Sequence, residues 1–176
     1  MSERRNIPPP HPASLDVDTL LESCEVGKGR SGGPGGQHRN KVETKVTIEH
    51  LPTGVLAQAS ERRSAVENRA VAIQRLRLAL AIAVRCPVGL GEIRSELWKR
   101  RSDANGRIAC SPTHEDFPAM LAEALDVIEG SGFDVPKAAL RLCCTTSQLI
   151  KLVKDHPAAF ESLNRQRAER GMHGLR

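Results

Sequence analysis

Alternating positions along the chain predict two β-strands. Over residues 42–51, side chains suited to a buried face alternate with charged or polar ones, which indicates a half-buried strand. The turn residues Pro-Thr-Gly at 52–54 separate it from a second expected strand over 54–60. The two strands are therefore expected to form an antiparallel hairpin.

A helical period follows the hairpin. From Ser64 to about Val84, apolar residues recur at steps of three and four, which predicts one helix with a single buried face. Because a long helix laid on a small sheet buries both apolar faces together, residues 14–85 are expected to form a two-layer domain. Within it, Ser14 is expected to cap a short helix that runs to Cys24.

Proline content and charge distinguish the remaining segments. Residues 1–13 are rich in proline and are expected to form a flexible N-terminal arm. Lys and Arg outnumber Asp and Glu in residues 86–114, which are expected to form a basic linker. Amphipathic helical patterns recur in residues 115–176, which are expected to form a helical C-terminal domain. The predicted fold class is therefore α+β, a small sheet packed on a long helix with a C-terminal helical extension.

Within the C-terminal domain, the pattern over residues 138–154 predicts two short helices joined by a turn. One interpretation is a helix-turn-helix whose second helix presents Gln148, Lys151 and Lys154 to nucleic acid. The other is a helical hairpin that closes a small three-helix cap, and this second arrangement is favoured because short helix pairs are common.

Composition indicates a polyanionic partner. The 176 residues carry a net charge of +5, and Lys and Arg gain affinity for polyanions by releasing counterions. With one Trp, three Phe and no Tyr, few side chains could stack on nucleobases, so contacts to nucleic-acid backbone are expected to dominate.

The cysteine and hydrophobic patterns indicate a cytoplasmic protein. Five cysteines without paired CxxC spacing are typical of reduced, mostly buried thiols rather than of a disulfide framework or a zinc site. No apolar run approaches about 18 residues, and the N-terminus lacks the hydrophobic core of a signal peptide. We expect a monomer that does not enter a membrane and that holds neither metal nor cofactor.

The stretch GKGRSGGPGGQHRNK, residues 27–41, combines glycines and cations around a single glutamine. A nucleotide phosphate loop would need GxxxxGK followed by Ser or Thr at the start of a helix, and a strand follows here instead. A GXXG clamp on nucleic-acid backbone matches Gly32-Gly33-Pro34-Gly35 in four letters, but it normally joins two helices and no convincing helix precedes Gly32.

A third interpretation is a catalytic loop centred on Gln37. Gly35 and Gly36 permit backbone conformations that point N–H groups at one oxygen, and donors fixed in advance stabilise the charge that develops in acyl transfer. The Gln37 amide is able to orient a water without being a strong nucleophile. Such a loop has to be delivered to an ester that is held elsewhere.

The stretch GRSGGPGGQHRNKVETKVTIEHLPTGVLAQASERRSAVENRAVAIQRL resembles the GGQ domain of the peptide chain release factors. The resemblance covers roughly residues 24–85 and extends well beyond the tripeptide. It includes Arg30 and Ser31 before GPGGQ, Asn40 and Lys41 after it, the HLPTG turn, Arg63-Ser64 and Asn68. Ala65 departs from the pattern, since the family usually carries glutamine there.

This resemblance implies a ribosome-dependent hydrolase that cleaves the ester between the nascent peptide and transfer RNA in the peptidyl-transferase centre. Gly35, Gly36 and Gln37 would form its catalytic loop. The Gln37 N–H would stabilise the transition state or the leaving ribose oxygen, and its side chain would shape the pocket that admits water. The ribosome and the substrate's own hydroxyl would supply the rest, so no cofactor is implied. His38 follows the tripeptide, but the family assigns no chemistry to that position.

Basic and polar residues near the loop and in the tail are the expected RNA contacts. In the GGQ domain these are Arg30, Ser31, Arg39, Asn40, Lys41 and Arg63. In the tail they are Lys151, Lys154, Arg165, Arg167 and Arg170. The neighbouring Arg62, Arg69, Arg75 and Arg77 are expected to divide between RNA contacts and residues that keep the outer helix face solvated.

Only residues 1–26 precede the glycine loop, so no stop-codon decoding domain is expected. The layout is similar to stand-alone GGQ rescue proteins, which free stalled ribosomes without reading a stop codon. We therefore expect a codon-independent release factor whose partners are the ribosome, through its large-subunit RNA, and peptidyl-tRNA. The alternative is a non-catalytic RNA-binding factor whose loop only docks on the ribosome.

Overall fold

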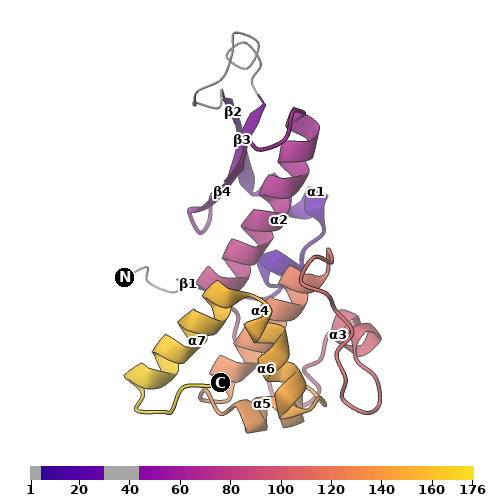
Figure 1. The fold of residues 1–176 in the computed structure, drawn as a ribbon, viewed down its shortest axis with the longest axis vertical. Helices are drawn as coiled ribbons and strands as arrows, with labels where there is room; N and C mark the ends of the chain where they lie inside the picture. The colour runs from indigo at the N-terminus through magenta and orange to yellow at the C-terminus, as the bar shows by residue number, and fades with distance from the viewer. Residues whose placement is uncertain (1–4, 30–43) are drawn as a thin grey trace.

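The computed structural model of the protein describes residues 5–29 and 44–176. Its first half is a three-stranded antiparallel sheet covered by a long helix (Figure 1). The sheet has the order β2-β3-β4, with strands at Cys24–Gly29, Lys45–His50 and Val55–Ala59. The long helix α2, Ala65–Ala83, packs against β3 and β4. This arrangement confirms the expected α+β fold class.

The hairpin and α2 form because their apolar periods face each other. Val46 and Ile48 of β3 are buried and pair in register with Ala59 and Ala57 of β4. The buried apolar stripe of α2 consists of Ala72, Ile73, Leu76, Leu80 and Ala81. Removing this apolar surface from water is the main stabilising contribution to such a two-layer unit.

β2 is a strand that the sequence pattern does not predict. It pairs with β3 from Cys24 opposite His50 to Gly29 opposite Lys45. Because it is an edge strand with mostly exposed residues and two glycines, it has no alternation of apolar side chains. Pairing with β3, rather than local propensity, therefore determines its conformation.

Asp16, and not Ser14, caps the first α-helix, so the sequence-based prediction was wrong here. The helix α1 spans Val17–Glu22, and the Asp16 carboxylate accepts a hydrogen bond from the Thr19 N–H at 3.0 Å. Ser14 instead ends a short 3₁₀-helix, η1, at Pro12–Ser14. A carboxylate at the helix start satisfies a free N–H group and also interacts favourably with the helix dipole.

The N-terminal segment is docked over its described residues, which contradicts the expected flexible arm. The strand β1, Arg5–Asn6, pairs in parallel with β5, Val84–Arg85, which continues directly from α2. His11 and Ala13 are buried, and the Nε2 atom of His11 lies 3.3 Å from the Val84 carbonyl oxygen. Proline content favours extended chain but gives no information about such long-range contacts.

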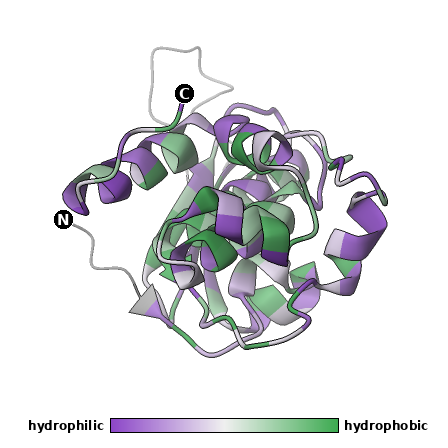
Figure 2. Cartoon of the chain, turned by 90° about the horizontal axis from the view of Figure 1, so that it is seen from below, coloured by the Kyte–Doolittle hydropathy of each residue, from purple (hydrophilic) through white to green (hydrophobic). Residues whose placement is uncertain are grey.

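The second half is built around helix α4, Phe117–Gly130, which is buried along most of its length. Three further helices pack in this half: α5 at Val135–Arg141, α6 at Thr146–Lys154 and α7 at Pro157–Glu169. α4 also packs against α2, and the buried side chains of both halves belong to one hydrophobic cluster. Viewed from this end (Figure 2), hydrophobic residues gather between the helices.

The segment expected as a basic linker is folded onto these helices. It contains α3, Glu96–Arg101, whose Trp98 is completely buried. The Trp98 indole N–H donates to the Leu142 carbonyl at 3.0 Å, and Arg101 forms an ion pair with Asp116 at 2.6 Å. One of its basic residues, Arg101, therefore joins α3 to the start of α4.

The turn between α5 and α6 favours the helical cap over the helix-turn-helix. In a helix-turn-helix, the N-terminal turn of the second helix faces the nucleic acid. Here a loop covers that end of α6, because Thr145 N–H donates to the Gly106 carbonyl at 3.2 Å and the Gln148 side chain accepts from Ile108 N–H at 3.2 Å. A Cβ atom on Gly106 would lie 3.0 Å from Cys144 Cα, so the loop packs closely against the turn.

Candidate catalytic and RNA-binding site

The residues assigned to catalysis lie outside the described residues. These are Gly35, Gly36 and Gln37, and the same holds for Arg30, Ser31, Arg39, Asn40 and Lys41. The structure describes the chain on both sides of them: β2 ends at Gly29 and β3 begins at Lys45, and these two residues are paired in the sheet. Neighbouring strands therefore hold the two flanks of the candidate loop at one end of the sheet.

Asn68 fixes the chain beside this end of the sheet. Its side chain is completely buried, and its NH₂ group donates to the carbonyls of Thr44 at 2.6 Å and Arg62 at 3.0 Å. Its oxygen accepts from the Arg62 N–H at 2.9 Å. One amide therefore links α2 to the segment before it and to the residue that precedes β3.

Sequence reasoning missed the structural role of Asn68, although the residue is part of the family resemblance. The signal that could have indicated it is an asparagine inside an otherwise apolar helical pattern. Asn is a poor helix former because its side chain competes for backbone hydrogen bonds. A polar side chain at such a position is therefore a candidate for a specific contact with neighbouring backbone.

The opposite end of the hairpin is closed by the HLPTG turn. The buried side chains of His50 and Thr53 contact each other at 2.7 Å between Nδ1 and Oγ1. Gly54 donates its N–H to the His50 carbonyl at 2.7 Å and has a φ of +59°, a conformation that favours glycine. Burial lowers the pKa of His50, so the neutral imidazole is favoured in this turn.

The arginines before and along α2 fall into two groups. Arg62, Arg63 and Arg69 are exposed, and their side chains form no ion pair or hydrogen bond with a described residue. They flank Val66 in the sequence, and Val66 is 79% exposed near the start of the helix. These side chains are available to a partner at the same end of the molecule as the flanks of the candidate loop.

Arg75 and Arg77 are used within the protein. Arg75 forms an ion pair with Glu61 at 2.5 Å and donates to the Gln58 carbonyl at 2.9 Å. Arg77 donates to the carbonyls of Ala13 at 3.1 Å and Glu115 at 2.9 Å, so it joins α2 to η1 and to the segment before α4.

The basic residues of the tail are also divided. Lys151 and Arg165 are exposed, although Lys151 pairs with Asp155 at 2.8 Å. Lys154 is exposed as well, and its ammonium lies 5.9 Å from the centre of the Phe160 ring.

Arg167 and Arg170 hold the C-terminal end of the chain in place. Arg167 donates to the carbonyls of Phe133 and His173, the latter at 3.1 Å. The Arg170 guanidinium lies 4.0 Å from the centre of the Phe133 ring, a cation–π arrangement. Of the five tail residues assigned to RNA, these two therefore contact Phe133, which lies outside α7.

The cysteines are all free thiols, of which Cys86 is buried and Cys143 exposed, while the other three are partly buried. Within residues 5–29 and 44–176, no group of three or more His, Cys, Asp or Glu side chains is arranged to hold a metal ion. None of the helices in that part of the chain is long and apolar enough to span a bilayer.

Comparison with known proteins shows which family the sequence matches. The family model named RF-1 domain matches residues 14–103, which include the sheet, α2 and α3. The chain is 41% identical over 68 residues to peptide chain release factor 1 of Chloroherpeton thalassium, covering 39% of this chain and 19% of that protein. It is 44% identical over 66 residues to peptide chain release factor 2 of Treponema pallidum, covering 38% and 18%.

Another match covers a larger share of the chain. Peptide chain release factor 1 of Erythrobacter litoralis is 34% identical over 135 residues, which cover 70% of this chain and 37% of that protein. The chain thus spans between about a fifth and just over a third of the length of these relatives. Because the family model matches more than half of its residues, the chain belongs to the peptide chain release factor family.

Proposed function

We propose that this protein hydrolyses the ester of peptidyl-tRNA in the peptidyl-transferase centre of the ribosome. The observation that carries the proposal is the Gly35-Gly36-Gln37 sequence inside the region that matches the family. Its flanks are paired in the sheet, and Asn68 ties that part of the sheet to α2. A fixed base of this kind is what a loop needs when it has to be placed against an ester bound elsewhere.

In this proposal the loop acts by positioning. The Gln37 N–H donates to the oxygen on which negative charge develops, and its side chain controls the entry of water. Gly35 and Gly36 allow the backbone to approach the ester closely. The ribosome and the substrate's hydroxyl complete the site, so the protein itself supplies no general base.

The exposed arginines beside the loop contribute the contacts to large-subunit RNA. Arg63, with Arg62 and Arg69, presents cations that are not neutralised by described neighbours, which suits binding to phosphates. Arg30, Ser31, Arg39, Asn40 and Lys41 are proposed to extend this contact along the loop. In the tail, Lys151, Lys154 and Arg165 are the proposed contacts.

We also propose that release does not depend on a stop codon, and that the protein rescues stalled ribosomes in the cytoplasm as a monomer. This part rests on residues 104–176. Their helices pack onto the same core as the proposed catalytic domain, and they carry the exposed basic side chains of the tail. Such a unit offers contacts to RNA backbone, which carry no sequence information directly.

Three ribosome complexes test both parts of the proposal. Each carries the same labelled peptidyl-tRNA, with an empty decoding site, a sense codon or a stop codon there. Codon-independent rescue predicts release from the empty complex, with no gain from a stop codon. Release only at a stop codon would contradict the rescue proposal but not the hydrolase proposal.

Absence of release from all three complexes would contradict hydrolysis itself. If salt-sensitive binding persisted in that case, the exposed arginines would favour the second candidate function, a non-catalytic RNA-binding factor.

A further inference from the structure

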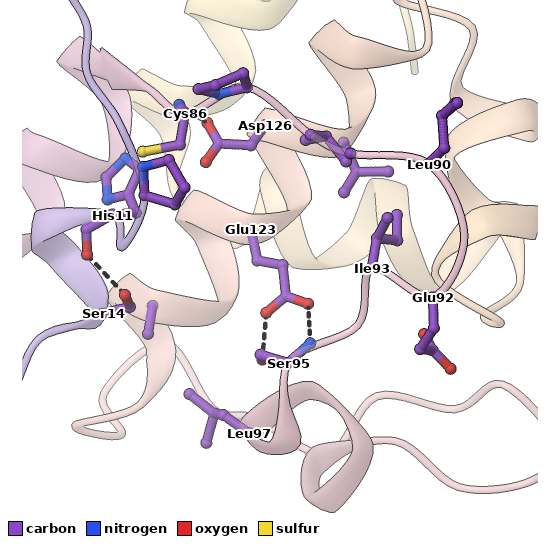
Figure 3. Close-up of a pocket in the computed structure, with 16 residues that line it drawn as sticks. His11, Ser14, Cys86, Leu90, Glu92, Ile93, Ser95, Leu97, Glu123 and Asp126 are labelled. Atoms are coloured by element: carbon purple, nitrogen blue, oxygen red, sulfur yellow. Dashed lines mark hydrogen bonds between the residues drawn. The ribbon is translucent and has the colours of Figure 1, made fainter.

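A cavity of about 450 Å³ lies in the helical half of the molecule, and Figure 3 shows the residues that line it. Its walls come from residues 9–14, from the loop 86–97 and from α4. It adjoins the C-terminal end of α2, whereas Asn68 marks the other end. At 1.5 Å per residue, Asn68 and the C-terminal end of α2 at Ala83 are about 22 Å apart along the helix. The cavity is therefore distinct from the candidate catalytic site.

Much of the cavity wall is apolar. The apolar side chains that line it include Val88, Leu90, Ile93, Leu97, Ala119 and Val127. Leu90 is 100% exposed, so it buries no surface within the protein. A fully exposed leucine on the loop that forms the cavity gives a partner apolar surface to cover. The volume falls within the range of pockets that bind small ligands or a few side chains.

The charged groups of the cavity are acidic. Glu92, Glu123 and Asp126 line it, and the described residues that form its wall include no Lys or Arg. His11 also lines it, but burial lowers the pKa of His11 to about 4, so the imidazole is neutral. Glu92 forms an ion pair with Arg94 at 2.7 Å and Asp126 lies 3.7 Å from Arg85, so Glu123 is the carboxylate of this wall that has no cationic partner among the described residues. Phosphate groups are disfavoured in such a place, and cations are favoured.

Two of the carboxylates are held rigidly. Glu123 accepts from the Ser95 N–H at 2.8 Å and from the Ser95 hydroxyl at 2.5 Å, as Figure 3 shows. Asp126 accepts from the Cys86 N–H at 3.2 Å and lies 3.7 Å from the Arg85 guanidinium, which is buried behind it. A carboxylate has about four lone-pair sites, so Glu123 retains capacity for a further donor.

We infer that this cavity binds a segment of a partner protein in which Arg or Lys stands beside an apolar residue. The cation donates to Glu123 on α4, and its aliphatic stem lies along Ile93 and Leu97. The neighbouring apolar side chain covers Leu90 at the edge. Charge complementarity and the apolar wall together favour this occupant over RNA.

Titration of the ¹⁵N-labelled full chain with acetyl-Leu-Arg-Leu-amide tests the inference by NMR. We expect saturable shifts confined to residues 88–97 and α4. The matched neutral peptide, acetyl-Leu-Gln-Leu-amide, is expected to bind about tenfold more weakly, because a charge-assisted hydrogen bond is lost. Equal affinity of the two peptides, or shifts elsewhere, would overturn the inference.

Three variants locate the binding and control for folding. Leu90→Ser is expected to weaken the arginine peptide about fivefold through lost apolar contact. Leu140→Ser, on an exposed leucine of α5, is expected to leave affinity unchanged. Glu123→Gln retains an oxygen for Ser95 but removes the charge, and is expected to abolish the preference for the arginine peptide. Thermal unfolding of each variant confirms that it is folded.

Competition defines the class of occupant. Butylguanidinium binding as tightly as the peptide would contradict a protein segment and indicate a small cation. Displacement of the peptide by an RNA oligonucleotide would also contradict it. Because no ribosome is present, these outcomes are independent of the release activity.

Discussion

Asn68 is the buried polar side chain closest to the flanks of the candidate loop. Asn68→Ala would leave the Thr44 carbonyl and both backbone groups of Arg62 without their present partner. We expect a loss of about 2–4 kcal/mol in unfolding free energy and slower peptide release, measured by urea unfolding and by a release assay. Asn105→Ala, in an exposed loop, is the control. Unchanged stability and release in Asn68→Ala would show that these bonds are unimportant.

His11 gives a prediction about pH. Burial lowers its pKa from 6.5 to about 4, so between these values the unfolded chain binds more protons than the folded protein. The unfolding free energy therefore rises with pH in this window. The contribution of neutral His11 is complete above about pH 6.5 and is lost as the pH falls towards 4; its size is about 3 kcal/mol.

His11→Asn isolates this contribution, because its side-chain oxygen can still accept from the Ala13 N–H without titrating. The stability difference between wild type and variant is expected to be larger at about pH 7 than at about pH 4.5. Burial raises the pKa of Asp126 to about 7, which acts in the opposite sense, but Asp126 is present in both proteins. A pH-independent difference would contradict the prediction.

Residue types near the loop were predictable, but their partners were not. Asn68 belongs to the family pattern, yet its bond to Thr44 spans 24 positions. Arg167 and Arg170 resemble RNA-binding residues of a basic tail, and both contact Phe133 of a distant turn. Composition gives the number of charged side chains, whereas only the folded structure shows whether a charged side chain already has a partner within the protein.

The exposed arginines near the start of α2 are expected to affect ribosome binding, whereas Arg77, which is bonded within the protein, is expected to affect stability. Arg63→Ala with Arg69→Ala is expected to weaken ribosome binding and to reduce the slope of log affinity against log salt by roughly 0.7–0.9 for each lost phosphate contact. Both side chains are exposed, so thermal stability should be preserved.

Arg77→Ala is the matched control on the same helix. It removes bonds to Ala13 and Glu115 and is expected to lower stability while leaving the salt slope unchanged. Co-sedimentation with ribosomes over a salt series measures the slopes. Equal slopes for wild type and the double variant would exclude Arg63 and Arg69 from the phosphate contact.

Elements in which apolar residues recur at a regular spacing could be predicted from the sequence, whereas a strand that forms only by pairing with its neighbour could not. The hairpin and α2 follow from alternation and from a three-to-four-residue period, because both bury one face. β2 is an exposed edge strand, and its pairing with β3 is a tertiary event. The role of α6 depends on the loop at Gly106, which covers its first turn and which no local pattern indicates.

In the whole molecule, one hydrophobic cluster joins the sheet and α2 to the C-terminal helices. Ending the chain after Gly130 would remove buried residues of this cluster, among them Leu142, Leu149, Leu152 and Leu163. We expect the full chain to unfold in a single transition and the shortened chain to lose stability throughout, including the sheet and α2. Calorimetry and hydrogen exchange measure this. Native protection of α2 in the shortened chain would contradict a shared core.

The core shared by the two halves also determines how the C-terminal tail should be tested. Because shortening the chain is expected to destabilise the sheet and α2, point variants are more informative. Lys151→Ala with Arg165→Ala changes exposed side chains and is expected to weaken ribosome binding without lowering stability. Unchanged affinity would remove these two residues from the proposed RNA contact.

In the proposed mechanism, the Gln37 N–H stabilises the transition state of ester hydrolysis. The most direct measurement is the single-turnover rate of peptide release from stalled ribosomes at saturating protein. Gln37→Pro removes this N–H, whereas Gln37→Ala retains it and removes the side-chain amide. We predict that Gln37→Pro slows release by about a hundredfold or more, with a smaller loss for Gln37→Ala and unchanged ribosome binding in both. Release by Gln37→Pro at the wild-type rate would contradict the claim.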